Sequence, residues 1–203
     1  MLDLLVCAAT EIESRLLKPH AEVLHTGVGA VNAAYALTGF LARTQVNRIV
    51  VCGIGGAYRA AGLAIGDVVC AESECYGDLG VESPEGFLDM ESLGFPLITS
   101  PSTRFNTFPL QIFPHPRRVK FVTVNTCAGT DALSEVMQKR TGGAVESMEG
   151  AAIVHVAAMA GVPVGEIRGI SNYTGNRDRA SWRIEQASTA AQQALISWIL
   201  KTL

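Results

Sequence analysis

Continuous apolar runs recur along the chain and are separated by stretches with helical spacing. The runs have the length of buried strands, and most are bounded by glycine, proline or polar residues. We expect strands at residues 2–8, 21–26, 48–52, 67–74, 120–124, 144–147 and 164–170.

The intervening stretches favour helices. Residues 30–43, 131–139 and 148–160 are predicted as helices, and residues 181–203 as an amphipathic closing helix. Thr10 followed by Glu13 fits the capping box S/T-x-x-E, so a further helix is expected to begin there. Alternating strands and helices predict an α/β fold whose ligands bind at the ends of the strands.

Residues 76–118 fit neither pattern. They are rich in Gly, Pro, Ser and Phe, and we expect irregular loops with room for one short helix. A long loop inside a compact domain is more often a lid or a subunit contact than a plain connection.

Composition narrows the classes of function. Apolar residues make up 48% of the 203 residues and charged residues 17%, which fits one domain with a well-buried core. The net charge of −3, with both signs interspersed, argues against a nucleic-acid partner. Met1 leads directly into a strand and no run approaches the length of a membrane span, so we expect a cytoplasmic protein without a membrane partner.

The five cysteines do not suggest a metal centre. No CxxC pair or Cys/His cluster with zinc spacing occurs, so neither a metal site nor a cofactor is expected. Small buried hydrophobes in a reducing compartment are the simplest interpretation. Cys127, beside Gly129, is the candidate for a reactive thiol.

Two glycine-rich segments follow predicted strands. In Gly27-Val28-Gly29 and in Gly53-Ile54-Gly55-Gly56, turns would let backbone N–H groups approach an oxygen-rich ligand. Neither has the spacing of a dinucleotide fingerprint or a P-loop, so plain connections remain the alternative.

Three charged residues stand at positions where a site would form. Glu13 follows the first strand, and Glu149 begins an otherwise apolar helix, where the helix N-terminus would equally favour a carboxylate without a function. Arg168 lies inside an apolar strand, where burial requires a carboxylate or an anion beside it. The polar segment 171–179 that follows could equally be a solvated loop.

The order of these features resembles the nucleoside phosphorylase and methylthioadenosine nucleosidase superfamily. The resemblance is carried by Val-Glu-Ser-Met-Glu-Gly-Ala-Ala at 145–152 and by Gly-Gly-Ala at 55–57 with Ile-Gly-Asp-Val-Val at 65–69. The ending Gly-Ile-Ser-Asn-Tyr-Thr-Gly-Asn-Arg-Asp-Arg-Ala-Ser-Trp at 169–182 is similar to the futalosine hydrolases within that superfamily. The resemblance implies a single three-layer domain over residues 1–203, with a mixed central sheet flanked by helices, and a homo-oligomer.

The same resemblance implies the residue roles in cleavage of a purine–ribose bond. Glu13 would orient and deprotonate the attacking water with Arg168 beside it, Glu149 would bind the ribose hydroxyls, and Met148 would pack on the sugar. Asn172 would face the purine at N7 and its 6-substituent. The remaining expected substrate-binding residues are Ser171, Gly55, Gly56 and Tyr173.

Asn172 bears on the identity of the base. The adenine-releasing relatives have aspartate here, whereas an asparagine NH₂ donates to a 6-oxo group and its carbonyl accepts from a protonated N7. This favours a 6-oxopurine such as hypoxanthine over adenine. Together with it, the resemblance implies hydrolysis of the small-molecule nucleoside futalosine to hypoxanthine and dehypoxanthine futalosine, a step of menaquinone biosynthesis.

Three alternatives stay open. One is an adenine-releasing nucleosidase acting on methylthioadenosine, adenosylhomocysteine or aminofutalosine. A second is a purine nucleoside phosphorylase, which needs cationic anchors for phosphate. In the hexameric phosphorylases one such arginine precedes the second glycine-rich segment, whereas here residues 49–52 are apolar and Arg59 lies beyond the segment, which favours hydrolysis. A non-catalytic nucleoside binder would be expected to lack at least one of Glu13, Glu149 and Arg168.

Overall fold

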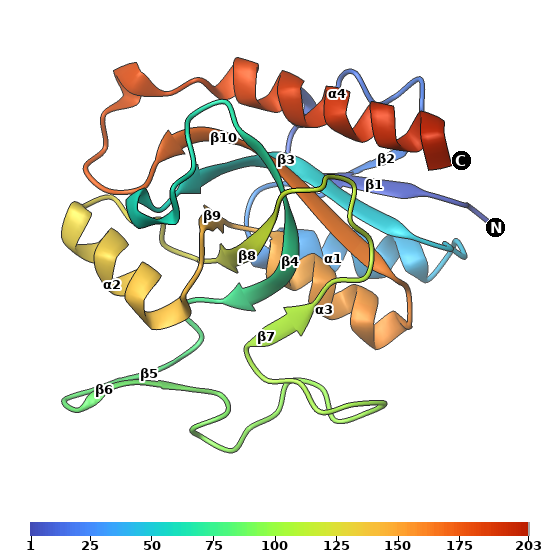
Figure 1. The fold of residues 1–203 in the computed structure, drawn as a ribbon. Helices are drawn as coiled ribbons and strands as arrows, with labels where there is room; N and C mark the ends of the chain where they lie inside the picture. Colours follow the sequence, from blue (N-terminus) through green and yellow to red (C-terminus); the bar gives the residue numbers. More distant parts are fainter. Residues whose placement is uncertain (203) are drawn as a thin grey trace.

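The computed structural model describes residues 1–202, and in them a mixed sheet lies between helical layers (Figure 1). Its strands are β1 (Leu5–Ala8), β2 (Glu22–His25), β3 (Ile49–Ala57), β4 (Val68–Tyr76), β7 (Thr107–Pro109), β8 (Arg118–Thr123), β9 (Val145–Ser147) and β10 (Val164–Tyr173). The helices are α1 (Ala30–Leu41), α2 (Asp131–Thr141), α3 (Gly150–Ala160) and α4 (Ile184–Thr202). The predicted fold class is confirmed.

The strand order is β10-β4-β8-β9-β3-β1-β2, with β7 paired to β4. Because β3 also pairs with β10, the strands β3, β10, β4, β8 and β9 close into a ring, from which β1 and β2 extend as a short open sheet. The strands β1, β3 and β10 are mutually aligned in parallel, so their carboxyl ends meet at one edge.

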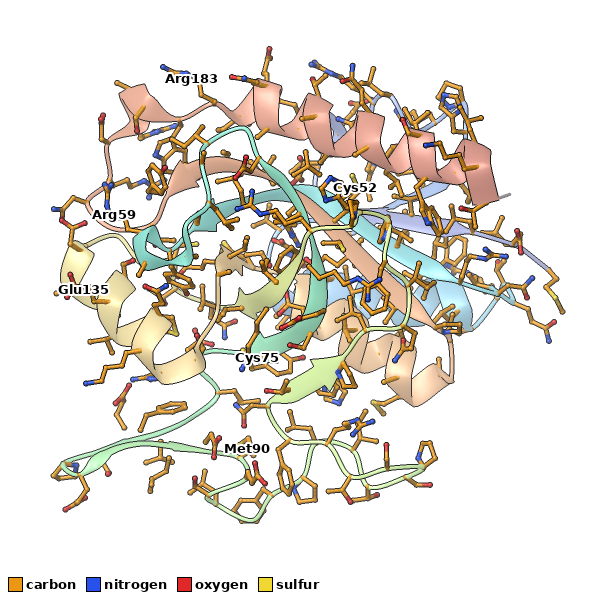
Figure 2. The ribbon with its side chains drawn as sticks, viewed as in Figure 1. Cys52, Arg59, Cys75, Met90, Glu135 and Arg183 are labelled. Atoms are coloured by element: carbon orange, nitrogen blue, oxygen red, sulfur yellow. The ribbon has the colours of Figure 1, made fainter. Side chains whose placement is uncertain are left out.

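Alternate residues of the central strands pack against opposite helical layers. On β3, Ile49 and Val51 belong to the core under α1 and α3, whereas Val50 and Cys52 belong to the core under α4. Figure 2 shows Cys52 on the strand beneath α4. A strand buried on both faces has this period of two within an unbroken apolar run, which is why residues 48–52 are recognisable from sequence.

The closing helix covers one face of the sheet. It begins at Ile184, later than the predicted residue 181, because residues 179–181 form a separate 3₁₀ turn. Ala191, Leu195 and Ile199 are buried at helical spacing against the sheet. The last residue of the predicted helix, Leu203, lies outside the described residues.

Three predicted local structures are wrong. The segment Gly53 to Ala57 is not a turn but the second half of β3. The helix expected from the capping box at Thr10 is only a 3₁₀ turn, Glu11–Glu13, followed by further turns. Within 76–118 the structure has no helix but a hairpin of β5 (Gly80–Ser83) and β6 (Gly86–Asp89), then β7.

The second half of β3 contains glycines because side chains from neighbouring elements occupy the space where a Cβ would lie. An ideal Cβ on Gly53 would lie 2.6 Å from Glu13 Oε1 and 2.8 Å from Arg168 Nη1. One on Gly56 would lie 3.0 Å from Thr174 Cγ2. The glycines therefore permit close approach of functional side chains to a strand rather than a change in chain direction.

Replacement of Leu195 by alanine tests the packing of α4. We expect Leu195→Ala to lower the free energy of unfolding by about 2–5 kcal/mol, because it leaves a cavity in a fully buried position. Urea denaturation followed by circular dichroism measures the change. Leu200→Ala in the same helix, where the side chain is 70% exposed, is the control and should change stability by less than about 0.5 kcal/mol. Equal losses in the two variants would contradict this packing.

Candidate active site

A cavity of about 720 Å³ opens at the carboxyl ends of β1, β3 and β10. The N-terminus of α3 and the segment 125–129 form further parts of its wall. All nine residues singled out from the sequence line this one cavity: Glu13, Gly55, Gly56, Met148, Glu149, Arg168, Ser171, Asn172 and Tyr173. The structure thus brings them together, while the role of each stays a prediction.

Glu13 is held by its own turn and by β3. The backbone N–H and the hydroxyl of Thr10 donate to Glu13 Oε2 at 3.1 and 2.7 Å, and the N–H of Ile54 donates to Oε1 at 3.1 Å. The capping box predicted from the sequence is present, although the helix it begins is a single turn. Oε2 therefore has both lone pairs occupied by Thr10, whereas Oε1 keeps one lone pair for a further donor in the cavity.

The closing helix anchors the turn that carries Glu13. Ser188 Oγ and Gln192 Nε2 both donate to the carbonyl oxygen of Ile12, at 2.7 and 3.0 Å, and Gln192 Oε1 accepts from Leu16 N–H at 2.8 Å. Ser188 and Gln192 are fully buried. The position of Glu13 is therefore fixed by residues about 180 positions away in sequence.

Arg168 lies at the centre of the charged groups. Its Nε donates to Glu166 Oε1 at 2.7 Å, its Nη1 donates to the carbonyl oxygen of Ile54 at 2.8 Å, and its Nη2 lies 3.7 Å from Glu149 Oε2. Burial lowers the pKa of this guanidinium, but the surrounding carboxylates, including Glu13, bring the pKa above its ordinary value. The side chain is therefore a permanent cation facing several carboxylates.

Glu149 is the residue that precedes α3, and its carboxylate reaches back to the start of α1. The N–H of Gly29 donates to Glu149 Oε1 at 3.0 Å. Gly29 has a φ of 95°, which a residue with a side chain rarely adopts. The first glycine-rich segment thus does bring a backbone N–H to an oxygen, but in this structure the oxygen belongs to Glu149.

Asn172 is turned into the cavity at a β-bulge. The pairing of β10 with β3 shifts by one residue between Ile170 and Asn172, leaving Ser171 unpaired. Ser171 Oγ donates to Asn172 Oδ1 at 2.7 Å, and Asn172 Nδ2 donates to the carbonyl oxygen of Tyr173 at 2.9 Å. Because the Tyr173 carbonyl can only accept, it fixes the position of Nδ2, and the amide keeps one N–H and one lone pair unused.

Several residues around the site were missed from the sequence. Glu146 is buried, accepting from Tyr58 Oη at 2.9 Å and from Ala128 N–H at 2.9 Å, so it supports the cavity wall. Glu166 and Glu74 are fully buried behind Arg168. Glu166 could have been predicted from the sequence, because a buried arginine requires a carboxylate beside it and Glu166 stands two residues before Arg168 in the same strand.

Cys127 is exposed, and the other four cysteines are buried. Its side chain lies against the cavity wall, where partial desolvation of the sulfur and the nearby carboxylates of Glu146 and Glu149 raise the pKa of the thiol to about 11, which disfavours the reactive thiolate. Across residues 1–202, no three His, Cys, Asp or Glu side chains are grouped so that they could hold a metal ion.

None of the helices described is long and apolar enough to span a membrane.

Comparison with known proteins places this chain in a family. Residues 15–202 match the model of the phosphorylase superfamily. The chain is 39% identical to the futalosine hydrolase of Acidothermus cellulolyticus, over 86% of this chain and 73% of that protein. It is 35% identical to the futalosine hydrolase of Thermus thermophilus, over 85% and 78% of the two chains.

Solved structures agree on the fold. A methylthioadenosine/adenosylhomocysteine nucleosidase from Neisseria meningitidis, in complex with methylthio-immucillin-A, superposes with a TM-score of 0.81 at 18% identity over the full length of both chains. Futalosine hydrolase of Helicobacter pylori superposes with a TM-score of 0.80 at 15% identity, over 100% and 98% of the two chains. The chain therefore belongs to the phosphorylase superfamily and, within it, to the futalosine hydrolase family.

Proposed function

We propose that the protein hydrolyses the N-glycosidic bond of futalosine, releasing hypoxanthine and dehypoxanthine futalosine in menaquinone biosynthesis. Relatives that are 35–39% identical over most of the chain bear the name futalosine hydrolase. The observation that carries the proposal is the single cavity into which Glu13, Glu149 and Asn172 open from three separate elements.

Glu13 is the base that activates water. Hydrolysis of a nucleoside passes through an oxocarbenium-like ribosyl cation, which a positioned water then captures. The Thr10 and Ile54 donors hold the Glu13 carboxylate in place and leave it able to accept from that water. Its negative charge also stabilises the ribosyl cation.

Glu149 and Met148 form the ribose site. The Glu149 carboxylate accepts from the 2′- and 3′-hydroxyls of the sugar, and the Met148 side chain packs on its face. Support comes from their adjacent positions in the cavity wall and from the backbone N–H of Gly29, which holds one Glu149 oxygen. A hydrogen bond from a hydroxyl to a carboxylate is stronger than one between neutral groups.

Asn172 binds the leaving base. The free N–H of Nδ2 donates to the 6-oxo group and the free lone pair of Oδ1 accepts from protonated N7. The bond to Tyr173 supports this polarity, because its carbonyl oxygen can only accept and turning the amide over would place two acceptor oxygens against each other. An adenine base would direct its 6-amino group against the Asn172 N–H, leaving polar groups unpaired.

Water is the acceptor rather than phosphate. The cations that line the cavity are Arg168, which already faces three carboxylates, and Arg177, whose guanidinium lies 5.3 Å from the centroid of the Trp182 ring. Residues 49–52 are buried and apolar, and Arg59 is exposed at the edge of the molecule (Figure 2). A phosphate dianion would therefore meet several carboxylates and only one cation outside the Arg168 cluster, Arg177, which is fewer cationic anchors than it requires.

The rival functions have less support. Solved adenine-releasing nucleosidases share the fold at 18–19% identity, which carries no information on the base. A non-catalytic binder does not require a carboxylate positioned to activate water, as Glu13 is proposed to do. Glu13, Glu149 and Arg168 all line the cavity.

The setting of the enzyme is part of the proposal. We infer that residues 1–203 act as one domain in the cytoplasm, as a homo-oligomer that binds neither nucleic acid nor membrane. Val31 and Tyr35, one turn apart on α1, are 81% and 82% exposed, and such apolar faces commonly form subunit contacts. Light scattering coupled to size-exclusion chromatography measures the oligomeric state.

The first prediction concerns the reaction. Purified protein should release hypoxanthine from futalosine in phosphate-free buffer, with no increase in rate on addition of phosphate. Chromatography of the base and of the ribose product measures both. Strict dependence on phosphate, with a ribose 1-phosphate product, would support a phosphorylase instead.

The second prediction concerns the base. Asn172→Asp should shift the ratio of kcat/KM for futalosine to that for aminofutalosine by about ten- to a hundredfold toward the 6-amino substrate, because aspartate accepts where asparagine donates. Both substrates are assayed at equal concentrations. Asn125→Asp, a matched change in the cavity wall away from β10, should leave the ratio unaltered. An unchanged ratio in Asn172→Asp would mean that this residue does not contact the base.

The third prediction concerns the two carboxylates. Glu13→Gln and Glu149→Gln should each lower kcat/KM by at least about a hundredfold while leaving the circular dichroism spectrum unchanged. Glu11→Gln is the matched control, because Glu11 lies in the same turn as Glu13 but is exposed and pairs with Lys18 at the surface. Near-normal turnover in both active-site variants would contradict the mechanism.

A further inference from the structure

Two carboxyl groups lie behind Arg168, on the side away from the cavity. Glu166 on β10 and Glu74 on β4 are both fully buried, and neither lines the cavity. The mechanism proposed above uses neither of them directly. Buried carboxyl groups are costly, so their bonding partners indicate what they do.

The two carboxyl groups converge on Gly150. A Cβ on that glycine would collide with Glu74 Oε1 and with both oxygens of Glu166. Glu166 Oε1 accepts from Arg168 Nε at 2.7 Å, whereas Glu166 Oε2 is buried and has no hydrogen-bond partner among the described residues when both groups are taken as carboxylates. An acceptor in this position requires a donor, and the side chain that faces it is Glu74.

The other bonds of Glu74 show where a proton on it would lie. The N–H of Cys75 donates to Glu74 Oε2 at 2.9 Å, and Thr123 Oγ1 donates to Glu74 Oε1 at 3.1 Å. Thr123 Oγ1 in turn accepts from the Ala151 N–H at 2.7 Å, so the threonine proton is directed at Glu74. A proton on Glu74 Oε1 therefore points to Glu166.

The charges favour a proton at this position. Burial raises the pKa of the Glu74 carboxyl well above its ordinary value, and the Glu166 carboxylate raises it further, against a smaller opposing effect of Arg168. From its own strand, the titratable neighbours are Cys75 and Tyr76. Burial also raises the pKa of Glu166, but its ion pair with Arg168 keeps the charge there.

We propose that Glu74 is a positioning residue that stays protonated, donates a hydrogen bond to Glu166 Oε2, and thereby fixes the Arg168 guanidinium between Glu13 and Glu149. The inference rests on the proposed function only for the consequence that misplacing Arg168 slows hydrolysis. Glu74 acts as a neutral donor: with it, Glu166 has partners on both oxygens, and Arg168 is oriented from behind by a rigid side chain.

Substitutions of Glu74 distinguish a role as a neutral hydrogen-bond donor from a role as a charged carboxylate. Glu74→Gln keeps a donor toward Glu166, so kcat for futalosine should stay within about threefold of the native value. Glu74→Leu removes the donor and leaves Glu166 Oε2 unpaired, so kcat should fall by about tenfold or more. Glu72→Gln, on the same strand but exposed, should have no effect. A fall in Glu74→Gln as large as that in Glu74→Leu would overturn the proposal.

Stability as a function of pH gives a readout without substrate. A glutamate with a raised folded-state pKa binds more protons folded than unfolded, so its contribution to stability falls as the pH rises above its ordinary value of 4.5. Glu74→Gln cannot ionise in either state. Its melting temperature relative to the native protein should therefore increase between about pH 4 and about pH 7.

The opposite trend would overturn the proposal. If Glu74 were a stabilised carboxylate, Glu74→Gln would lose melting temperature relative to the native protein as the pH rises. Failure of the native protein to cleave futalosine would instead refute the proposed function and leave this measurement interpretable. Glu74→Leu serves the kinetic comparison alone, so a failure of that variant to fold leaves both the Glu74→Gln activity and the pH profile as tests.

Discussion

The guanidinium of Arg168 organises the charged part of the molecule. It is almost fully buried, with bonds to Glu166 and to the carbonyl of Ile54 and an ion pair with Glu149. A buried cation is tolerated because carboxylates surround it, and the buried carboxylates are tolerated because the cation is there. The glycine at position 53 belongs to the same constraint, since its missing side chain leaves the space in which Glu13 and Arg168 approach each other. The charged wall of the cavity and the glycine in β3 are thus both arranged around Arg168.

Much of the fold can be predicted from the sequence because its strands and helices carry strong patterns. Residues 49–52 are apolar on both faces, and α4 has its buried residues at helical spacing, so both were recognisable. The second half of β3 was not, because glycine in a strand and glycine in a turn look alike when the side chains that need the space come from distant elements. The hairpin of β5 and β6 carries no apolar alternation that distinguishes it from a loop.

In the candidate site, too, some features could be predicted from the sequence and others could not. The positions of Glu13, Glu149 and Arg168 could be expected from charges placed in apolar surroundings and from the family resemblance. The bulge at Ser171, which directs Asn172 into the cavity, could not, because it depends on the register between β10 and β3. The contribution of Ser188 and Gln192 to the placement of Glu13 joins opposite ends of the chain, and no local pattern encodes it.

The closed ring of strands has a consequence for the behaviour of the chain in a crowded solution. Closure satisfies the hydrogen-bonding groups along most of the sheet and leaves open edges at β2 and at the three-residue strand β7, which pairs with β4 alone. The β2 edge is four residues long and carries Glu22 and His25, both exposed, and the β7 edge ends in Pro109, which has no N–H to donate. A short border with ionisable side chains is a poor template for strand addition by another polypeptide, so the architecture itself discourages aggregation along the sheet.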